Sequence, residues 1–221
     1  MRVVLKLGGR IASDSVGLVL ERRAAGDEVV VVHGAGPQIT AELQSRGIGV
    51  RFVDGRRVTD PATLAVVRGS LVAVGAELSA ALGPAALHHV GDEIGLEATR
   101  VAELGLVGEP LPCRPAAVEA ALAAGLIPVV TPVAVGPLNV NADEAATALA
   151  LGLQAERIVF VSDVPGVYVE GAVASRLDAD AADELLDAGA FDGGIVPKLL
   201  AAVRAARLGI TAEIGETAVV A

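Results

Sequence analysis

The sequence predicts a three-layer α/β/α sandwich with a central, mostly parallel sheet. Four short runs rich in Val and Ile, each bounded by Gly, Pro or charge, have the composition of strands buried on both faces: residues 3–7, 28–33, 127–131 and 157–162. Stretches rich in Ala, Leu, Glu and Arg lie between these runs. Such alternation of strand and helix is typical of a parallel sheet covered by helices.

The helical stretches are marked by their ends as well as by their composition. Several begin at Pro or follow Asp, residues that are favoured at helix N-termini. We expect helices over residues 13–25, 37–46, 61–82, 115–124, 142–151 and 198–208. In a sheet of this kind ligands lie beyond the carboxyl ends of the strands, where this chain has glycine-containing loops.

A short hairpin is predicted between the second and third helices. Residues 51–53 and 57–59 are joined through Asp54-Gly55, a dipeptide that favours the positive φ of tight hairpin turns. We expect this hairpin to project a basic pair, Arg56 and Arg57. Since no linker, repeat or low-complexity tract stands out, we expect residues 1–221 to form one domain.

Composition excludes several classes of function. The formal net charge of −10 argues against nucleic acid as a partner, because phosphate backbones are held by clustered basic surface. Glycines and charges interrupt every apolar run, so we expect no membrane span, and the N-terminus lacks a signal-peptide pattern. We therefore expect a cytoplasmic protein. The single cysteine, Cys113, and the three histidines are too few for a zinc-type site, and we expect no dedicated metal site.

Lysine is rare in this chain and occurs at two suggestive places. Of the 17 basic residues only Lys6 and Lys198 are lysines, and each lies close to a pair of glycines. A chain that otherwise uses arginine needs a compact ammonium at these positions if the choice is functional. The alternative is compositional bias that left two lysines by accident.

Two glycine-containing loops follow the first two predicted strands. In LKLGGR, residues 5–10, the missing side chains of Gly8 and Gly9 let an anion approach the backbone amides. HGAGPQ, residues 33–38, leads into a helix whose N-terminal N–H groups favour an anion. Either loop alone is also compatible with a simple tight turn. The chain contains neither a dinucleotide fingerprint nor a GxxxxGK[ST] P-loop.

Three further segments lie at the ends of predicted strands or at the start of helices. NVNAD, residues 139–143, places two amides and a carboxylate before a helix, where Asp143 would either cap the helix or orient a lysine. FVSDVPGV, residues 160–167, and FDGGIVPK, residues 191–198, would together form a nucleotide pocket, or each would be an ordinary turn.

Taken in order, eight segments resemble the amino acid kinase family, and within it the branch that phosphorylates N-acetyl-L-glutamate: LKLGG, VVHGAGPQI, DGRRVTD, GLVGE, IPVVTPVAVG, NVNADEAATALA, SDVPGV and DGGIVPK. The match covers nearly the whole chain. It implies an amino acid kinase-like fold and phosphoryl transfer from MgATP to the side-chain carboxylate of N-acetyl-L-glutamate, giving an acyl phosphate in arginine biosynthesis. A carboxylate is already ionised at pH 7, so catalysis would reduce to alignment and charge neutralisation.

The resemblance also implies roles for individual residues. Lys6 and Lys198 would contact the transferring phosphoryl group from opposite sides, and Asp143 would hold both ammonium groups in place. The substrate would be bound by Ala35, Gly36, Arg57, which grips a carboxylate, and Asn139, which fixes the amino-acid end. The nucleotide would be bound by Gly8, Gly9, Asp163, Val164, Pro165, Gly166, Val167, Tyr168, Ala190, Phe191 and Asp192.

Larger features follow from the same resemblance. Residues of about 1–135 would form the acceptor-substrate half and residues of about 136–221 the nucleotide half. Mg²⁺ would be held mainly by ATP oxygens and water. The apolar helix over residues 61–82 matches the element that pairs two subunits in the family, which implies a homodimer.

The chain departs from the family's pattern at several positions. Gly34-Ala35-Gly36 replaces three glycines, so the methyl group of Ala35 would crowd the substrate or merely restrict the backbone; Gly75-Ala76 replaces an Asn-Lys pair, and residues 88–95 replace a GLSG-like segment. These departures keep three alternatives open. One is a kinase for a carrier-bound aminoadipate derivative, which needs a basic surface around Arg51, Arg56 and Arg57. Another is a kinase for a different amino-acid carboxylate. The third is a non-catalytic amino-acid or nucleotide sensor.

Overall fold

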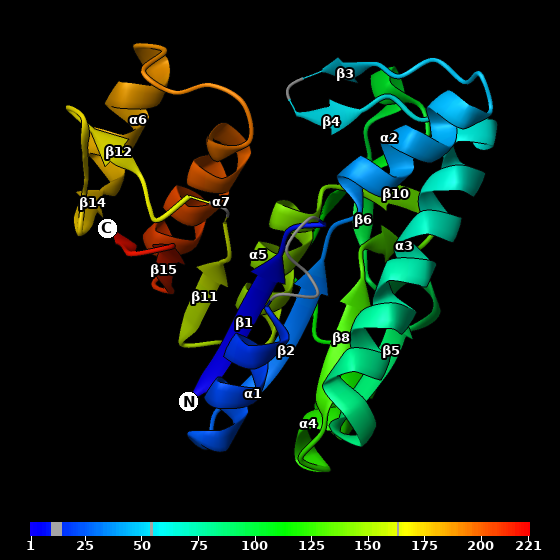
Figure 1. The fold of residues 1–221 in the computed structure, drawn as a ribbon, viewed down its shortest axis with the longest axis horizontal. Helices are drawn as coiled ribbons and strands as arrows, with labels where there is room; N and C mark the ends of the chain where they lie inside the picture. Colours follow the sequence, from blue (N-terminus) through cyan, green and yellow to red (C-terminus); the bar gives the residue numbers. More distant parts are fainter. Residues whose placement is uncertain (10–14, 54, 163) are drawn as a thin grey trace.

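The computed structural model of the chain describes residues 1–9, 15–53, 55–162 and 164–221. The strands of its central sheet are β1 (Arg2–Leu7), β2 (Glu28–His33), β5 (Ala86–Val90), β8 (Ile127–Thr131), β11 (Arg157–Phe160), β14 (Arg176–Asp178), β15 (Thr211–Ile214) and β16 (Thr217–Val220). Across the sheet they lie in the order β14-β16-β15-β11-β1-β2-β8-β5 (Figure 1). The strands from β15 to β5 are parallel, whereas β16 is antiparallel to β15 and carries β14 at its edge.

Helices cover both faces of this sheet. Side chains alternate along β1, so that Val3 and Leu5 face one apolar cluster and Val4 faces the other. The helices are α1 (Val16–Ala24), α2 (Gly36–Ser45), α3 (Pro61–Leu82), α4 (Ala116–Ala123), α5 (Ala142–Gly152), α6 (Ala179–Asp187) and α7 (Ile195–Arg207). Helices α1 and α3 pack on the first face, and α4, α5 and α7 on the second. The predicted three-layer α/β/α architecture is confirmed.

A second, smaller sheet and two hairpins complete the fold. The smaller sheet has the order β6-β7-β10-β9, with β6 (Ala98–Arg100), β7 (Val107–Pro110), β9 (Val133–Ala134) and β10 (Leu138–Val140). The hairpins are β3 (Phe52–Val53) with β4 (Arg56–Arg57), and β12 (Tyr168–Val169) with β13 (Ala172–Val173). In Figure 1 the β3–β4 hairpin lies beside α2 at the end of the sheet where β1 and β2 terminate.

The predicted elements occur close to their expected bounds. The strands over 28–33 and 127–131 and the helix over 61–82 match their predictions residue for residue, and the others differ at their ends by a few residues. Residues 13 and 14 of the first predicted helix lie outside the described residues. Sequence analysis missed β5, because His88 and His89 interrupt its apolar pattern, and it also missed α6, β14, β15 and β16.

Helix α3 is the one described helix long and apolar enough, by length and composition alone, to cross a membrane. In the structure its buried side packs against α2, β5 and β8. Leu71 joins the apolar cluster beneath α2, and Leu78 joins the cluster on the sheet. The apolar composition of this side of α3 is therefore accounted for by the core of the fold.

Candidate active site

A cavity of about 420 Å³ lies at the carboxyl ends of the parallel strands. Its walls include the residues that directly follow β1, β2 and β11, as expected for ligand sites of open parallel sheets. Nine of the predicted site residues line it: Lys6, Gly8, Gly9, Ala35, Gly36, Arg57, Asn139, Asp143 and Lys198. Segments from the beginning, middle and end of the chain thus meet at one place.

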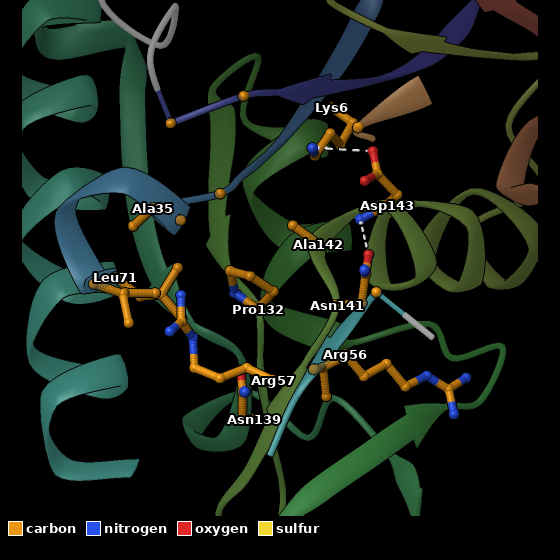
Figure 2. Close-up of a pocket in the computed structure, with 18 of the residues that line it drawn as sticks. Lys6, Ala35, Arg56, Arg57, Leu71, Pro132, Asn139, Asn141, Ala142 and Asp143 are labelled. Atoms are coloured by element: carbon orange, nitrogen blue, oxygen red, sulfur yellow. Dashed lines mark hydrogen bonds and ion pairs between the residues drawn. The ribbon is translucent and has the colours of Figure 1, made fainter. Parts of the chain in front are cut away.

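The carboxylate of Asp143 brings the two lysines together. Lys6 Nζ lies 3.0 Å from Asp143 Oδ1, and Lys198 Nζ lies 3.9 Å from Asp143 Oδ2 (Figure 2 shows the first contact). Lys6 and Asp143 are each 5% exposed, whereas the side chain of Lys198 is 16% exposed. Lys198 Nζ also donates to Gly194 O at 3.3 Å. Two ammonium groups therefore border the same cavity, held by one anion.

Three helices begin at the wall of the cavity: α2, α5 and α7. Asn141 caps α5, because its Oδ1 accepts from the amides of Asp143 at 2.8 Å and Glu144 at 3.3 Å. Asp143 is thus not the helix cap and is available to hold the lysines. No side chain caps α2 or α7 within the described residues. The N-termini of these two helices therefore present backbone N–H groups and positive dipole ends to a ligand.

The glycine-containing loops pack against each other too closely for larger residues. A Cβ added at Gly9 would lie 3.0 Å from Ala35 Cα and 2.9 Å from Gln38 Oε1. Gln38 Nε2 donates to Gly9 O at 3.0 Å. Gly34 N donates to Leu7 O at 2.9 Å, so the loop after β2 continues along the end of β1. The side chain of Ala35 is buried in the apolar cluster beneath α2.

Arg57 presents a buried guanidinium to the cavity. Its Nη2 donates to Thr40 Oγ1 at 3.0 Å, and its Cζ lies 4.5 Å from the centre of the Phe52 ring. Arg57 is 6% exposed, and its buried Nη1 has no hydrogen-bond partner among the described residues. Burial lowers the pKa of Arg57 from its ordinary value, but an arginine remains charged at neutral pH. An anionic ligand would supply the missing partner.

The other hairpin arginine faces a different neighbour. Arg56 Nε and Nη2 donate to Glu144 Oε1 and Oε2 at 2.9 and 3.1 Å. The predicted basic pair, Arg56 and Arg57, lines the cavity, but Arg57 is buried and Arg56 is engaged by Glu144. Of the three arginines considered for a basic surface, only Arg51 is exposed.

Asn139 is held by a residue that sequence analysis did not select. Its Nδ2 donates to Thr59 Oγ1 at 3.0 Å, and Thr59 Oγ1 donates to Arg57 O at 2.7 Å. This chain of bonds ties β10 to the end of the hairpin. Thr59 belongs to the RVTD segment, so its place in the motif was the available signal. Thr40 had no such signal, since its contact with Arg57 depends on the tertiary fold.

The predicted nucleotide residues divide into two groups. Gly8 and Gly9 line the cavity, whereas these residues do not: Val164, Pro165, Gly166, Val167, Tyr168, Ala190, Phe191 and Asp192. Asp163 lies outside the described residues. The Val167 side chain is 1% exposed and packs within the core. Val167 N donates to Thr217 Oγ1 at 2.8 Å, which fixes this segment against the start of β16.

The altered Gly75 position is not part of the cavity wall and packs against His33, which is buried, and His88, which is half-buried. Thr131 Oγ1 is hydrogen-bonded to His33 Nε2 at 3.1 Å and to His88 Nε2 at 2.8 Å. A Cβ at Gly75 would overlap His88 Nε2 and lie 2.8 Å from His33 Nε2. Glycine at this position therefore makes room for the two imidazoles.

The described residues contain no cluster of three or more His, Cys, Asp or Glu side chains that would hold a metal ion. Among the described residues, Asp143 is the one carboxylate that lines the cavity, and two lysines engage it. Burial raises the pKa of the Cys113 thiol and so keeps it in its unreactive form at neutral pH.

Comparisons with known proteins place the chain in a family. The model of the amino acid kinase family matches residues 1–216. An acetylglutamate kinase from Saccharopolyspora erythraea is 41% identical, covering 94% of this chain and 77% of its own; one from Chloroflexus aurantiacus is 37% identical, covering 93% and 88%. The structure of smu.665 from Streptococcus mutans UA159 has a TM-score of 0.90 and 26% identity, covering 99% of this chain and 98% of its own. Carbamate kinase from Giardia lamblia, at 14% identity and a TM-score of 0.74, shares the fold over 99% of this chain and 98% of its own. The chain belongs to the amino acid kinase family.

Proposed function

We propose that this chain transfers the γ-phosphoryl group of ATP to the side-chain carboxylate of N-acetyl-L-glutamate, as a step of arginine biosynthesis. The observation that carries the proposal is the pair of lysines that meet at Asp143 at the cavity wall. The relatives named above as acetylglutamate kinases, at 41% and 37% identity over most of the chain, support the choice of acceptor.

The chemistry needs little from the protein beyond alignment and positive charge. An acceptor carboxylate oxygen, already ionised, forms a bond to the γ-phosphorus while the bond from that phosphorus to the bridging oxygen breaks and ADP leaves. No proton has to be removed from the acceptor, so no general base is required. Lys6 and Lys198 neutralise charge on the moving group, and Asp143 holds their ammonium groups. The Mg²⁺ that accompanies ATP adds charge neutralisation at the phosphates.

The acceptor end of the cavity fits a carboxylate. Arg57 has an unpartnered, buried Nη1 among the described residues, and an arginine fork matches the two oxygens of a carboxylate. Asn139 is linked to Arg57 by Thr59, whose hydroxyl accepts from the Asn139 side chain and donates to the Arg57 carbonyl. We propose that Arg57 binds the carboxylate that is not phosphorylated and that Asn139 fixes the amino-acid end. The apolar side chains of Ile39, Leu71 and Pro132 line the same cavity and would contact the acyl group.

The nucleotide would lie along the opposite wall. Gly8, Gly9 and the uncapped start of α7 offer backbone amides to the phosphates. We propose that the adenine end reaches beyond this cavity toward residues 164–168 and 190–192, and that Asp163 takes part. In this arrangement residues of about 1–135 mainly serve the acceptor and residues of about 136–221 mainly serve the nucleotide, within one domain.

The alternatives predict different acceptors or no turnover. The surface expected for a carrier-bound aminoadipate is reduced to Arg51, because Arg56 is paired with Glu144 and Arg57 is buried. A sensor without turnover would have no need for two lysines held at one carboxylate. We therefore prefer the kinase for the free amino-acid derivative.

A coupled assay of ADP release tests the proposal directly. N-acetylglutamate, glutamate, aspartate and aminoadipate are compared as acceptors with MgATP. We expect turnover with N-acetylglutamate and much less with the other three. Binding of ATP without turnover on any acceptor would instead identify a sensor. Turnover only on aminoadipate would identify a kinase for a different amino-acid carboxylate.

We also propose that the protein is a cytoplasmic homodimer joined through α3. The side of α3 that faces away from the core exposes mainly small residues, among them Ala65, Gly69, Ala73 and Ala76. Small side chains allow close approach of a second helix. Sedimentation of the wild type and of Ala73→Arg tests this: the variant should become a monomer, and an unchanged dimer would place the interface elsewhere.

A further inference from the structure

The β3–β4 hairpin is the smallest element at the wall of the cavity. Each of its strands has two residues, and a ribbon of that size does not hold its position without other support. Phe52, Gly55, Arg56 and Arg57 of this hairpin all line the cavity. The position of the hairpin, and with it that of Arg57, must therefore be fixed by contacts of its side chains.

The two arginines of β4 grip opposite sides. Consecutive side chains on a strand point to opposite faces, and Figure 2 shows Arg57 directed toward Leu71 and Arg56 directed away from it. Arg57 is bonded to Thr40 on α2. Arg56 is bonded to Glu144 on α5. The strand between them is thus tied to one helix of the acceptor side and to one helix that carries Asp143.

The contact of Arg56 with Glu144 has a defined geometry. Two nitrogens of the guanidinium face the two carboxylate oxygens, at 2.9 and 3.1 Å, and the two side chains are 21% and 24% exposed. Such a bidentate pair fixes orientation as well as distance. Lysine has a single ammonium and cannot reproduce this arrangement.

Glu144 occupies a significant position on α5. It directly follows Asp143, and the backbone amides of both residues are bound by the Asn141 side chain. The turn of helix that holds the two lysines is therefore the same turn that holds Arg56. A weaker link connects the hairpin to α7. Glu109 Oε2 lies 3.9 Å from Arg56 Nη2, and Glu109 Oε1 lies 3.7 Å from Arg204 Nη1 on α7.

We propose that Arg56 and Glu144 are positioning residues that keep the β3–β4 hairpin closed over the bound acceptor. Through this pair, Arg57 is held at a fixed place relative to Asp143 and the lysines. The proposal rests on the proposed function, because it assumes that an acceptor carboxylate binds at Arg57. It assigns Arg56 a role in acceptor binding without direct contact with the reacting atoms.

Kinetics of single variants test the proposal. Arg56→Met and Glu144→Gln should each raise the KM for the acceptor about tenfold, the scale expected for loss of charged hydrogen bonds. The KM for ATP should stay unchanged, because the nucleotide wall is not part of the hairpin. Arg56→Lys should be intermediate, since it keeps the charge and loses the second bond. Arg114→Met is the matched control: it removes another Arg–Glu pair, with Glu119, at residues that do not line the cavity.

Hydrogen exchange supplies a measurement that needs no acceptor. The Val58 amide donates to Arg51 O at 3.0 Å and so reports on how stably the two ends of the hairpin are paired. It should exchange several-fold faster in Arg56→Met and Glu144→Gln than in wild type, and at the wild-type rate in Arg114→Met. Thermal unfolding of all variants checks that they are folded.

Two results would overturn the proposal. One is an acceptor KM and a Val58 exchange rate in Arg56→Met that match those of Arg114→Met. The other is a parallel rise of both KM values with a lowered melting temperature, which would make the pair merely structural. If wild-type protein itself uses none of the four acceptors, the proposed function fails. The exchange data then still decide whether the Arg56–Glu144 pair stabilises the hairpin.

Discussion

The two lysines at the cavity are held by different parts of the fold. Lys6 lies on β1 in the interior of the sheet, is 5% exposed, and is 3.0 Å from Asp143. Lys198 lies in the first turn of α7, is more exposed, and is 3.9 Å from the same carboxylate. One cation is therefore part of the core, whereas the other lies at the rim. Both should serve phosphoryl transfer, but only the first should also matter for folding.

Replacing either lysine should have the largest effect on turnover. Lys6→Met and Lys198→Met should each lower kcat by about 10²–10³-fold, as for loss of one group that stabilises transition-state charge. ADP release at saturating substrates measures this effect. Wild-type turnover in either variant would remove that lysine from the mechanism.

The stabilities of the same variants separate core from rim. Lys6→Met leaves a buried carboxylate without its nearest partner and should cost about 3 kcal/mol of unfolding free energy. Lys198→Met should cost less than about 1 kcal/mol, because its contact is longer and more exposed. Denaturant titration of both proteins provides the comparison. Equal losses would mean that the distinction between the lysines has no energetic basis.

A third cation extends the comparison to the acceptor wall. Arg57→Met should raise the acceptor KM by about tenfold to hundredfold and leave the KM for ATP unchanged, because it removes a charged fork that faces only the acceptor. Steady-state kinetics with each substrate varied in turn decide this. A larger change in the ATP KM than in the acceptor KM would show that Arg57 binds the nucleotide and not the acceptor.

The buried core contains an ionisable side chain, that of His33, which stays neutral. Burial, together with the charges of His88 and Lys6, lowers the pKa of His33 to about 4, although the bond to Gly34 opposes the shift. Between pH 6.5 and 4 the unfolded chain binds a proton at His33 and the folded chain does not. The free energy of unfolding therefore decreases as the pH is lowered. The loss between pH 7.5 and 5 should be about 2 kcal/mol.

Unfolding titrations of the wild type and of His33→Gln at both pH values test this contribution. The variant should lose less stability on acidification than the wild type. Burial also lowers the pKa values of His88 and His89, so some pH dependence should remain in the variant. An identical pH dependence in the two proteins would show that His33 titrates normally in the folded state.

The smallest expected effect concerns the support of Arg57. Thr40→Val removes the hydroxyl that accepts from Arg57 Nη2 while preserving the shape of the side chain. The acceptor KM should rise about fivefold, which corresponds to the net contribution of about 1 kcal/mol of a typical hydrogen bond. Thr63→Val on α3 is a control outside the cavity wall. A change in Thr40→Val no larger than in Thr63→Val would show that Arg57 is held by other contacts.

Much of the fold could be predicted because its central strands are uniformly apolar. The runs at β2 and β8 need no tertiary knowledge, since strands buried on both faces contain few polar residues. β5 could not be found in this way, because its two histidines interrupt the apolar run and His88 finds its partner, Thr131, only on another strand. The start of α7 was placed at Lys198, but the helix begins at Ile195, since Pro197 is tolerated in a first turn where N–H groups lack helical partners.

The candidate site was predicted unevenly for a related reason. Lys6, Asp143 and Lys198 belong to short segments at the ends of predicted strands or the start of helices, so their residue types alone made them candidates. The partners that fix the site, such as Thr40 for Arg57 and Glu144 for Arg56, are far away in sequence and carry no local signal. Asn141 was given no role of its own, yet its side chain caps α5 and leaves Asp143 available to the lysines.

The most direct test is a crystal structure with ADP, aluminium fluoride and N-acetylglutamate, which mimic the moving phosphoryl group between donor and acceptor. We predict that Lys6 Nζ and Lys198 Nζ both lie within hydrogen-bonding distance of the fluoride atoms, at about 3 Å. Asp143 should remain between the two ammonium groups. A structure in which either ammonium points to solvent, away from the fluoride group, would contradict the account.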